Sequence, residues 1–162
     1  MNELLNTNYN KIKQERGWTS HSRIMGEAVE MCVMTLPCPV CDQKYLHKCK
    51  TNEKAKDAFC ENCDAQIQIK ATKRKSQTPI QLLGAEYKTT LDSIKENKIN
   101  YIIVFYSEKS NIFTINNILF VNTEDIDVNC VIPRKPLSPQ ARRAGWQGCK
   151  LVFHKYKTIN IY

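Results

Sequence analysis

Two C-x-x-C pairs restrict the folds open to this chain more than any other feature of its sequence. Cys38-Pro-Val-Cys41 and Cys60-Glu-Asn-Cys63 are separated by eighteen residues. Each pair can turn its two thiolates toward one point, and two such turns supply the ligands of a tetrahedral zinc site that leaves no open position for chemistry. The spacing predicts a structural four-cysteine zinc ribbon at about residues 38–63. A redox C-x-x-C is the alternative, but that interpretation requires only one pair.

The remaining sequence indicates a globular, cytoplasmic protein. The first ten residues, MNELLNTNYN, contain no basic segment followed by an apolar run, so they do not predict a signal peptide. The longest strongly apolar run, Tyr101–Tyr106, is too short to cross a bilayer. A chain of 162 residues has room for one substantial core, and we expect a single domain over residues 1–162 that acts as a monomer. We interpret five other candidate ligands as packing or incidental residues: Cys32, His47, Cys49, Cys130 and Cys149.

Positive charge is distributed unevenly along the chain. The formal net charge is +8, and no acidic residue follows Asp127. The basic residues after that point are Arg134, Lys135, Arg142, Arg143, Lys150, Lys155 and Lys157, and a second basic cluster comprises Lys70, Lys73, Arg74 and Lys75. One-sided positive charge predicts a polyanionic partner such as nucleic acid, and a basic solubilising face is the alternative.

Hydrophobic periodicity predicts a mixed α/β domain with the ribbon inserted in it. Residues 20 to about 35 indicate a helix, with Glu27 off its apolar face. Leu83, Tyr87, Leu91 and Ile94 indicate a second helix of about four turns. The run Tyr101–Tyr106 predicts a strand buried on both faces. Shorter strands are expected at Ala55–Phe59, Ile67–Ala71, Ile112–Ile115, Ile118–Val121, Cys130–Ile132 and Leu151–His154. A short helix is expected to begin at Ser138-Pro139 and to end at Gly145.

A candidate catalytic group lies beside the second cysteine pair, where ten residues separate Asp57 from Gln68-Ile69-Lys70. Side chains alternate along a strand, so Gln68 and Lys70 share a polar face while Ile67 and Ile69 face the core. An adjacent antiparallel strand would bring the Asp57 carboxylate to the polar side. Two oxygen donors suit Mg²⁺, and an ammonium can stabilise the charge that develops on a phosphate. The pattern is short, and a solvated strand face would produce it as well.

A longer stretch of sequence resembles a known family. The segment from Arg134 to Cys149, RKPLSPQARRAGWQGC, is similar to a segment of the DpnI family of methyl-directed restriction endonucleases. The order C-P-x-C, Asp, C-x-x-C, x-x-K is kept as well, and Gly84-Ala85 followed by Tyr87 is similar to the start of that family's next helix. The likeness covers most of residues 20–150.

This resemblance implies a fold, a site and its cofactors. The implied fold is a PD-(D/E)XK restriction-endonuclease-like mixed sheet flanked by helices, whose active-site hairpin carries the zinc ribbon. By the match, Asp57 and Lys70 are the first acid and the lysine of the motif, and Glu27 corresponds to an acidic residue on the leading helix. The implied catalytic residues are Asp57, Gln68 and Lys70. The implied cofactors are structural Zn²⁺ and a catalytic Mg²⁺ held by Asp57 and Gln68, with Glu27 as a further candidate ligand.

Two departures from the family pattern bear on activity. The family has glutamate where this chain has Gln68. An amide oxygen can still ligate Mg²⁺, but one negative charge is lost. DpnI-like enzymes also continue into a winged-helix domain that has no counterpart in this sequence. Specificity is then expected to come from the catalytic domain alone, unless the sequence is a truncated product.

The resembling segment also contains the candidate DNA-binding residues. Arginines can contact phosphates or form paired hydrogen bonds with guanine in the major groove. Trp146 follows a glycine turn and can press its ring on a base or a methyl group. The alternative is Trp146 as a core anchor beside two solvated arginines. The candidates are Arg134, Lys135, Arg142, Arg143 and Trp146.

Together these features predict a type II restriction endonuclease that uses Mg²⁺ to hydrolyse double-stranded DNA at or near adenine-methylated GATC sites. A non-catalytic zinc-ribbon protein that binds DNA or senses its methylation is the main alternative, in which Gln68 reflects lost catalysis. An RNA-binding ribbon is a third interpretation.

Overall fold

The strand predicted at Tyr101–Tyr106 lies at the centre of the fold. The computed structural model describes residues 1–43, 45–49, 56–73, 79–96, 99–135, 138–140, 145 and 147–159. Strand β5 (Ile99–Lys109) is buried from its first residue through Tyr106. Its side chains alternate between two hydrophobic cores, with Ile102 in one and Tyr101 in the other. The prediction of a strand buried on both faces is therefore confirmed.

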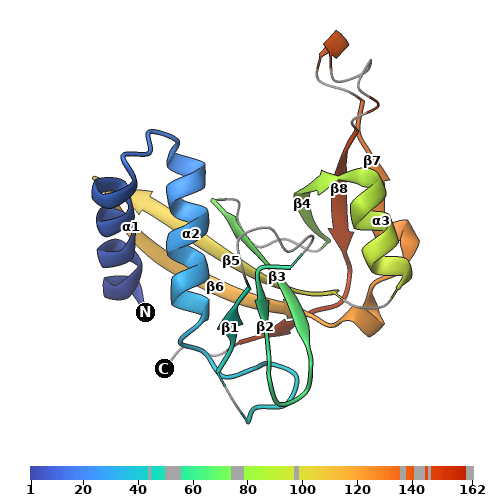
Figure 1. Cartoon of the computed structure of the whole chain (residues 1–162), viewed down its shortest axis with the longest axis horizontal. Helices are drawn as coiled ribbons and strands as arrows, with labels where there is room; N and C mark the ends of the chain where they lie inside the picture. The colour runs from blue at the N-terminus through green and yellow to red at the C-terminus, as the bar shows by residue number, and fades with distance from the viewer. Residues whose placement is uncertain are drawn as a thin grey trace.

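Strand β5 belongs to a six-stranded mixed sheet in the order β1-β2-β3-β5-β6-β9 (Figure 1). The pairing of β3 with β5 is parallel, and the other pairings in this sheet are antiparallel. The other strands are β1 (His47–Lys48), β2 (Ala58–Phe59), β3 (Gln66–Thr72), β6 (Ile112–Val121) and β9 (Lys157–Thr158). A separate antiparallel sheet has the order β4-β8-β7 and consists of β4 (Ile80–Glu86), β7 (Val131–Pro133) and β8 (Gly148–Phe153).

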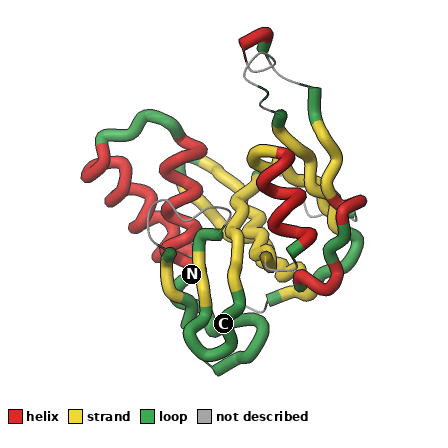
Figure 2. The backbone as a smooth tube through the Cα atoms, turned by 45° about the vertical axis from the view of Figure 1, so that its right-hand side comes forward, coloured by secondary structure: helices red, strands yellow, loops and turns green. Residues whose placement is uncertain are grey.

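The large sheet is the middle of three layers. Helices α1 (Asn2–Arg16) and α2 (His21–Val33) pack on one face, where Leu5, Val29 and Ile102 are in one core. The small sheet and α3 (Tyr87–Lys95) pack on the other face, around the core that contains Tyr101 and Leu151. Figures 1 and 2 show the two groups on opposite sides of the central strands. Short helices η1 (Thr123–Asp125) and η2 (Val128–Cys130) connect β6 to β7. This mixed α/β architecture confirms the predicted fold class.

Helix α1 was not expected, because its sequence is largely polar. Its buried stripe is short and comprises Leu5, Asn8, Tyr9 and Ile12. Two asparagines attach the helix to the open edge of β6. The Asn2 side-chain oxygen accepts a hydrogen bond from Ile115 N–H (2.8 Å), and the Asn6 amide both accepts from Phe113 N–H (2.9 Å) and donates to Phe113 C=O (2.7 Å). The helix therefore covers strand edge that β9 leaves unpaired.

Several predicted elements are present with shifted boundaries. The helix predicted at 20–35 is α2, and the strands predicted at Ile67–Ala71, Cys130–Ile132 and Leu151–His154 correspond to β3, β7 and β8. The two strands predicted between residues 112 and 121 form one strand, β6, in which the register shift opposite Phe105 and Tyr106 leaves Asn116 as an extra residue. The strand predicted at Ala55–Phe59 is described only as β2, because Ala55 lies outside the described residues.

The prediction of a helix that includes Leu83 is wrong for its first turn. Residues through Glu86 belong to β4, and α3 begins at Tyr87. The Glu86 carboxylate accepts hydrogen bonds from Lys88 N–H (3.1 Å) and Thr89 N–H (2.7 Å), so this side chain caps the helix and starts it one turn later. The helix expected from Ser138 to Gly145 is described only at Pro139 and Gln140. Among the described residues, no helix is long and apolar enough to span a membrane.

Gly84 marks a close approach between β4 and β8. It lies where the pairing of these strands shifts register, between Leu83 and Glu86. A Cβ atom added at Gly84 would be 2.2 Å from Cys149 Sγ. Glycine is therefore required here by a neighbouring side chain on the next strand.

We predict that Gly84→Ala lowers the free energy of unfolding by about 1–3 kcal/mol, because the added methyl group overlaps the Cys149 sulfur. Cys149→Ala removes that sulfur, so the double variant should regain much of the loss in urea unfolding. The control is Gly26→Ala in α2, where an added Cβ meets nothing within 4 Å and stability should rise by up to about 1 kcal/mol. An equal loss with and without the Cys149 change would contradict the overlap.

Candidate active site and metal centre

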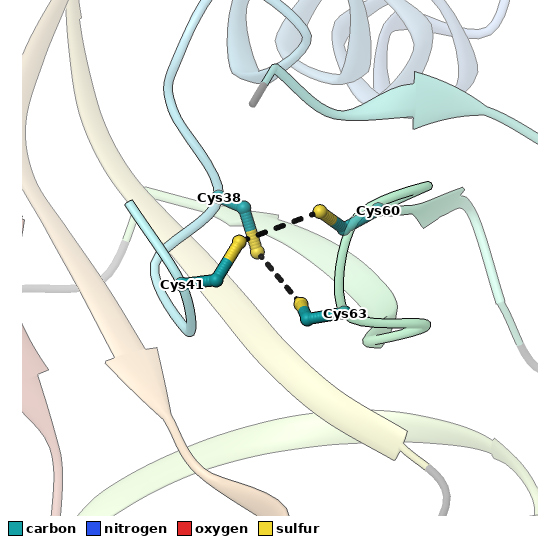
Figure 3. Close-up of side chains that lie close together, drawn as sticks. All are labelled: Cys38, Cys41, Cys60 and Cys63. Carbon is teal, nitrogen blue, oxygen red and sulfur yellow. Dashed lines mark hydrogen bonds between the residues drawn. The ribbon is translucent and has the colours of Figure 1, made fainter. Parts of the chain in front are cut away.

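Four cysteine sulfurs converge between the loop that precedes β1 and the turn that joins β2 to β3. Figure 3 shows Cys38 and Cys41 facing Cys60 and Cys63. All four sulfurs lie within 4.8 Å of one another, and the Cys38–Cys63 and Cys41–Cys60 pairs are each 3.7 Å apart. In a tetrahedral site with Zn–S bonds of about 2.3 Å, the sulfurs are about 3.8 Å apart. The cluster therefore has the geometry of the predicted structural zinc site.

The two cysteine turns have the same backbone conformation. Asp42 N–H donates to Cys38 C=O (2.9 Å), and Asp64 N–H donates to Cys60 C=O (3.0 Å). Both aspartates have a φ of 56°, in the left-handed region that aspartate tolerates. A hydrogen bond from the Gln43 backbone lowers the pKa of Cys41 to about 6, whereas burial raises the pKa of Cys38 and of Cys63. The repeated turn directs each pair of sulfurs to a common point.

Asp57 is held between β1 and β3, immediately before β2. Its backbone N–H donates to Ile67 C=O (2.9 Å), and its backbone C=O accepts a hydrogen bond from Cys49 N–H (2.9 Å). Its side-chain Oδ2 accepts a hydrogen bond from Ile69 N–H (2.7 Å). Ile69 lies between Gln68 and Lys70 in β3. The carboxylate is therefore placed at the level of the two polar β3 residues that the sequence singled out.

The predicted alternation of side chains along β3 is present. Ile67 and Ile69 are buried in the core with α1 and α2. Gln68 and Lys70 are half-buried and align with Tyr101 and Ile103 of β5, whose side chains belong to the opposite core. Because aligned residues of parallel strands point the same way, Gln68 and Lys70 are on the face toward the small sheet.

The Lys70 side chain is half-buried and lies near negatively charged groups. Burial lowers the pKa of Lys70, and the negative charge of Asp57 is the largest influence that opposes this shift, followed by Cys149 and Glu30. A cavity of about 150 Å³ adjoins Lys70 and is bounded on its far side by β4 residues, including Gln81 and Leu83. The nearby negative charges therefore only partly offset the effect of burial on this lysine.

Two glutamates of α2 approach this site from the helical side. Glu30 Oε2 is 3.0 Å from Lys48 Nζ, and Glu27 Oε1 is 3.7 Å from the same nitrogen and 3.5 Å from Arg16 Nη2. Burial raises the pKa of Glu30, the contact with Lys48 opposes that rise, and the charge of Asp57 adds to it. Glu27, Glu30, Lys48 and Asp57 all line one groove with a volume of about 830 Å³.

Glu30 is a candidate that the sequence analysis missed. Both glutamates contact Lys48, and the charge of Glu30 also acts on Lys70. The available signal was its position three residues after Glu27, which places both carboxylates on one side of a helix. Only the packing of α2 beside the Asp57 segment distinguishes the two glutamates.

The oxygen donors that the sequence and the structure single out approach β3 from two sides. Asp57, Glu27 and Glu30 line the groove on the helical side, whereas Gln68 faces the small sheet. The Lys70 ammonium supplies a positive charge on the adjacent strand position.

The candidate DNA-binding residues are only partly described. Arg134 and Lys135 follow β7, where Arg134 N–H donates to Gly148 C=O (2.9 Å) and Arg134 C=O accepts a hydrogen bond from Gln147 Nε2 (3.0 Å). The backbone here is thus fastened to the start of β8. Arg142, Arg143 and Trp146 lie outside the described residues.

The residues interpreted as packing residues are mostly buried. Cys32, Cys49, Cys130 and Cys149 are buried and lie outside the four-sulfur cluster. His47 is exposed, its ring centroid is 5.7 Å from that of Phe59, and its Nε2 is 3.6 Å from a Glu61 carboxylate oxygen. These four buried cysteines outside the cluster contribute to the protein interior, and His47 contacts Phe59 and Glu61 beside the cysteine cluster.

Comparison with known proteins gives one family match. Residues 1–158 match the family model described as "DpnI: Dam-replacing family". The match includes the ribbon cysteines, Asp57, Gln68 and Lys70, and the basic segment that follows β7.

We predict that the purified protein contains one Zn²⁺ per chain, bound by Cys38, Cys41, Cys60 and Cys63. Cys60→Ser should abolish zinc binding and leave largely insoluble protein, because zinc-binding free energy contributes directly to folding. Elemental analysis measures the zinc content. Cys130→Ser, which changes a buried cysteine outside the cluster, is the control and should retain zinc. Well-folded wild-type protein that contains no zinc would exclude the site.

Proposed function

This chain belongs to the DpnI, Dam-replacing family, and on that basis we propose that it is a type II restriction endonuclease. The proposed reaction is hydrolysis of phosphodiester bonds in duplex DNA at adenine-methylated GATC sites. The observation that carries this proposal is the placement of the Asp57 carboxylate against Ile69 N–H, between Gln68 and Lys70, in a chain of this family. The net charge of +8 supports DNA as the substrate.

In the proposed mechanism, the residues around β3 hold the scissile phosphate and a divalent cation. Asp57 and Gln68 would hold Mg²⁺, with Glu27 as a further candidate from the sequence and Glu30 as one from the structure. When bound, Mg²⁺ would supply a more acidic water molecule and neutralise charge on the phosphate. The Lys70 ammonium would stabilise negative charge as it develops on the phosphate oxygens. Its half-buried position strengthens that interaction, since water screens it less.

The basic segment after β7 would bind the DNA beside this site. We propose that Arg134, Lys135, Arg142 and Arg143 contact phosphates or base edges, and that Trp146 contacts a base or a methyl group. Charged contacts to phosphate set the affinity, whereas contacts to base edges select the sequence. The fastening of Arg134 to Gly148 and Gln147 would fix the base of this segment relative to the cleavage site.

Gln68 favours a second candidate function. A neutral amide in place of a carboxylate weakens a Mg²⁺ site that has few protein ligands. The Lys48 ammonium also lies within 4 Å of both Glu27 and Glu30, so these carboxylates already have a cationic partner. On this alternative, the protein binds or senses methylated DNA without cleaving it.

We predict that Asp57→Ala and Lys70→Ala each reduce cleavage by at least about a hundredfold, because each removes charge at the phosphate that reacts. Affinity for DNA should change little, since phosphate contacts elsewhere dominate binding. The measurement is cleavage of adenine-methylated and unmethylated plasmids in Mg²⁺, alongside binding of a labelled duplex.

Matched substitutions separate this effect from a general loss of charge. Lys73→Ala removes a lysine just beyond β3 that pairs with Glu108, and Asp92→Ala removes an exposed carboxylate of α3. Both should leave cleavage near the wild-type rate. Normal cleavage by Asp57→Ala and Lys70→Ala would show that the active site lies elsewhere.

A separate prediction concerns metal dependence. Wild-type protein should need a high Mg²⁺ concentration or prefer Mn²⁺, which binds such sites more tightly. Gln68→Glu restores a charged ligand, so we expect half-maximal activity at a lower metal concentration. Titration of Mg²⁺ and Mn²⁺ in the cleavage assay measures the shift.

Two results would change the conclusion. A wild-type protein that is inert at every metal concentration, together with a Gln68→Glu variant that cuts DNA, would establish the non-cleaving alternative. An unaltered metal titration in an active Gln68→Glu variant would exclude residue 68 as a ligand.

A further inference from the structure

We propose that Arg23, stacked on Trp18, is a phosphate clamp that holds the backbone of a DNA strand on the helical side of the active site. This inference rests on the proposed function, because its ligand is the DNA that the enzyme would cut. It concerns the connection between α1 and α2, which lies outside the basic segment after β7 and outside the cysteine cluster.

The groove of about 830 Å³ joins this connection to the candidate active site. Asp57 and Lys48 line it at the strand side, and Trp18 and Arg23 line it at the helix side. A strand whose phosphate reaches Asp57 can therefore continue along the groove with its next phosphates near α2. Given the proposed function, the occupant to which we assign this groove is the sugar–phosphate backbone.

Arg23 is held in place by an aromatic ring. Its guanidinium carbon is 3.7 Å from the centroid of the Trp18 ring, and that of Arg16 is 5.8 Å from it. Trp18 is half-buried and packs against the core formed with α1 and α2. Stacking on a fixed ring restricts the arginine side chain while the N–H groups at the guanidinium edge stay available for a phosphate.

Three other cations that line this groove have carboxylate partners. Lys11 Nζ is 4.0 Å from Glu15, and Arg16 and Lys48 pair with Glu27 and Glu30. Lys56 also has an interaction within the protein. For Arg23, by contrast, none of the described residues forms an ion pair. A phosphate bound at Arg23 would therefore displace no carboxylate of the described residues.

The position of the stack depends on the turn between the helices. Gly17 ends α1 with a φ of 60°, a left-handed conformation that reverses the chain and places Trp18 directly after the helix. Arg23 is in the first turn of α2, five residues later. Helix α1 and its terminal turn thus position the Trp18 ring, and α2 positions the Arg23 guanidinium. The strands that carry Asp57 and Lys70 contain neither residue.

The test measures DNA affinity in an Asp57→Ala background, in which the probe is not cut. The probe is a fluorescein-labelled duplex with one adenine-methylated GATC site, and its anisotropy is followed at several salt concentrations. Arg23→Ala should weaken binding by roughly tenfold and should reduce the salt slope by about 0.9, the value for one lost phosphate contact. Arg23→Lys should recover only part of the affinity, because an ammonium lacks the planar edge that stacking orients.

Lys13→Ala is the matched control, because it removes the same charge from an exposed residue of α1 that does not line the groove. We expect a smaller loss of affinity and a smaller change of slope. Duplexes with a single neutral methylphosphonate near the target site then locate the contact. At one position the methylphosphonate should weaken DNA binding by the protein that retains Arg23. The same methylphosphonate should not weaken DNA binding by Arg23→Ala any further.

The outcomes separate this inference from the proposed function. Equal effects of Arg23→Ala and Lys13→Ala, with wild-type protein that binds and cuts DNA, would overturn the clamp alone. A wild-type protein that does not bind the duplex would overturn both. Thermal unfolding of each variant provides the remaining check, because weaker binding with an unchanged melting temperature supports a contact with DNA. An Arg23→Ala loss that is fully explained by partial unfolding would assign the stack a structural role and overturn the clamp.

Discussion

The parallel pairing of β3 with β5 is the constraint on which the candidate site depends. Strand β5 is buried on both faces, so a shift of one residue would exchange its two sets of core side chains. The register therefore fixes Ile67 and Ile69 toward the helices, with Gln68 and Lys70 on the other face. Buried Asn100 secures the start of this pairing, because its amide donates to Gln66 C=O (3.0 Å) and accepts a hydrogen bond from Thr123 N–H (3.0 Å). The antiparallel pairing of β2 with β3 on the other side of β3 brings the Asp57 carboxylate to Ile69 N–H.

The cysteine cluster supports the same arrangement from the outer edge of the sheet. Strands β1 and β2 contain two residues each, which is too short for a stable hairpin in isolation. The four sulfurs lie between the loop before β1 and the turn after β2, and Asp57 directly precedes β2. Zinc bound at the cluster would hold the segment that positions the Asp57 carboxylate. Folding of the ribbon and geometry of the catalytic candidates are therefore coupled, although the sulfurs take no part in the chemistry.

The charge balance around Asp57 differs from that of the protein as a whole. The chain has a net charge of +8, yet Asp57, Glu27 and Glu30 gather in one groove with Lys48 and Arg16. Gln68 reduces the negative charge that a divalent cation would meet, and Glu30 is near enough to act on both Asp57 and Lys70. A cation bound beside these glutamates would have to displace Lys48 from them. Arg23 lies in the same groove and forms no ion pair among the described residues.

The sequence by itself determined the parts of this protein that depend on local pattern. Cysteine spacing identified the four-sulfur cluster, an unbroken apolar run identified β5, and alternation along β3 separated Ile69 from Gln68 and Lys70. Helix α1 was not predicted, because a polar helix is stabilised by contacts with the strand edge that it covers. The Glu86 cap was not predicted, because it depends on the position of one carboxylate relative to the Thr89 N–H. Glu30 and the Arg23–Trp18 stack could not be predicted either, since each depends on residues brought together by packing. Local sequence pattern determines the secondary structure and the cysteine turns. The contacts that balance charge between α2 and β3 form only when the helix packs on the sheet.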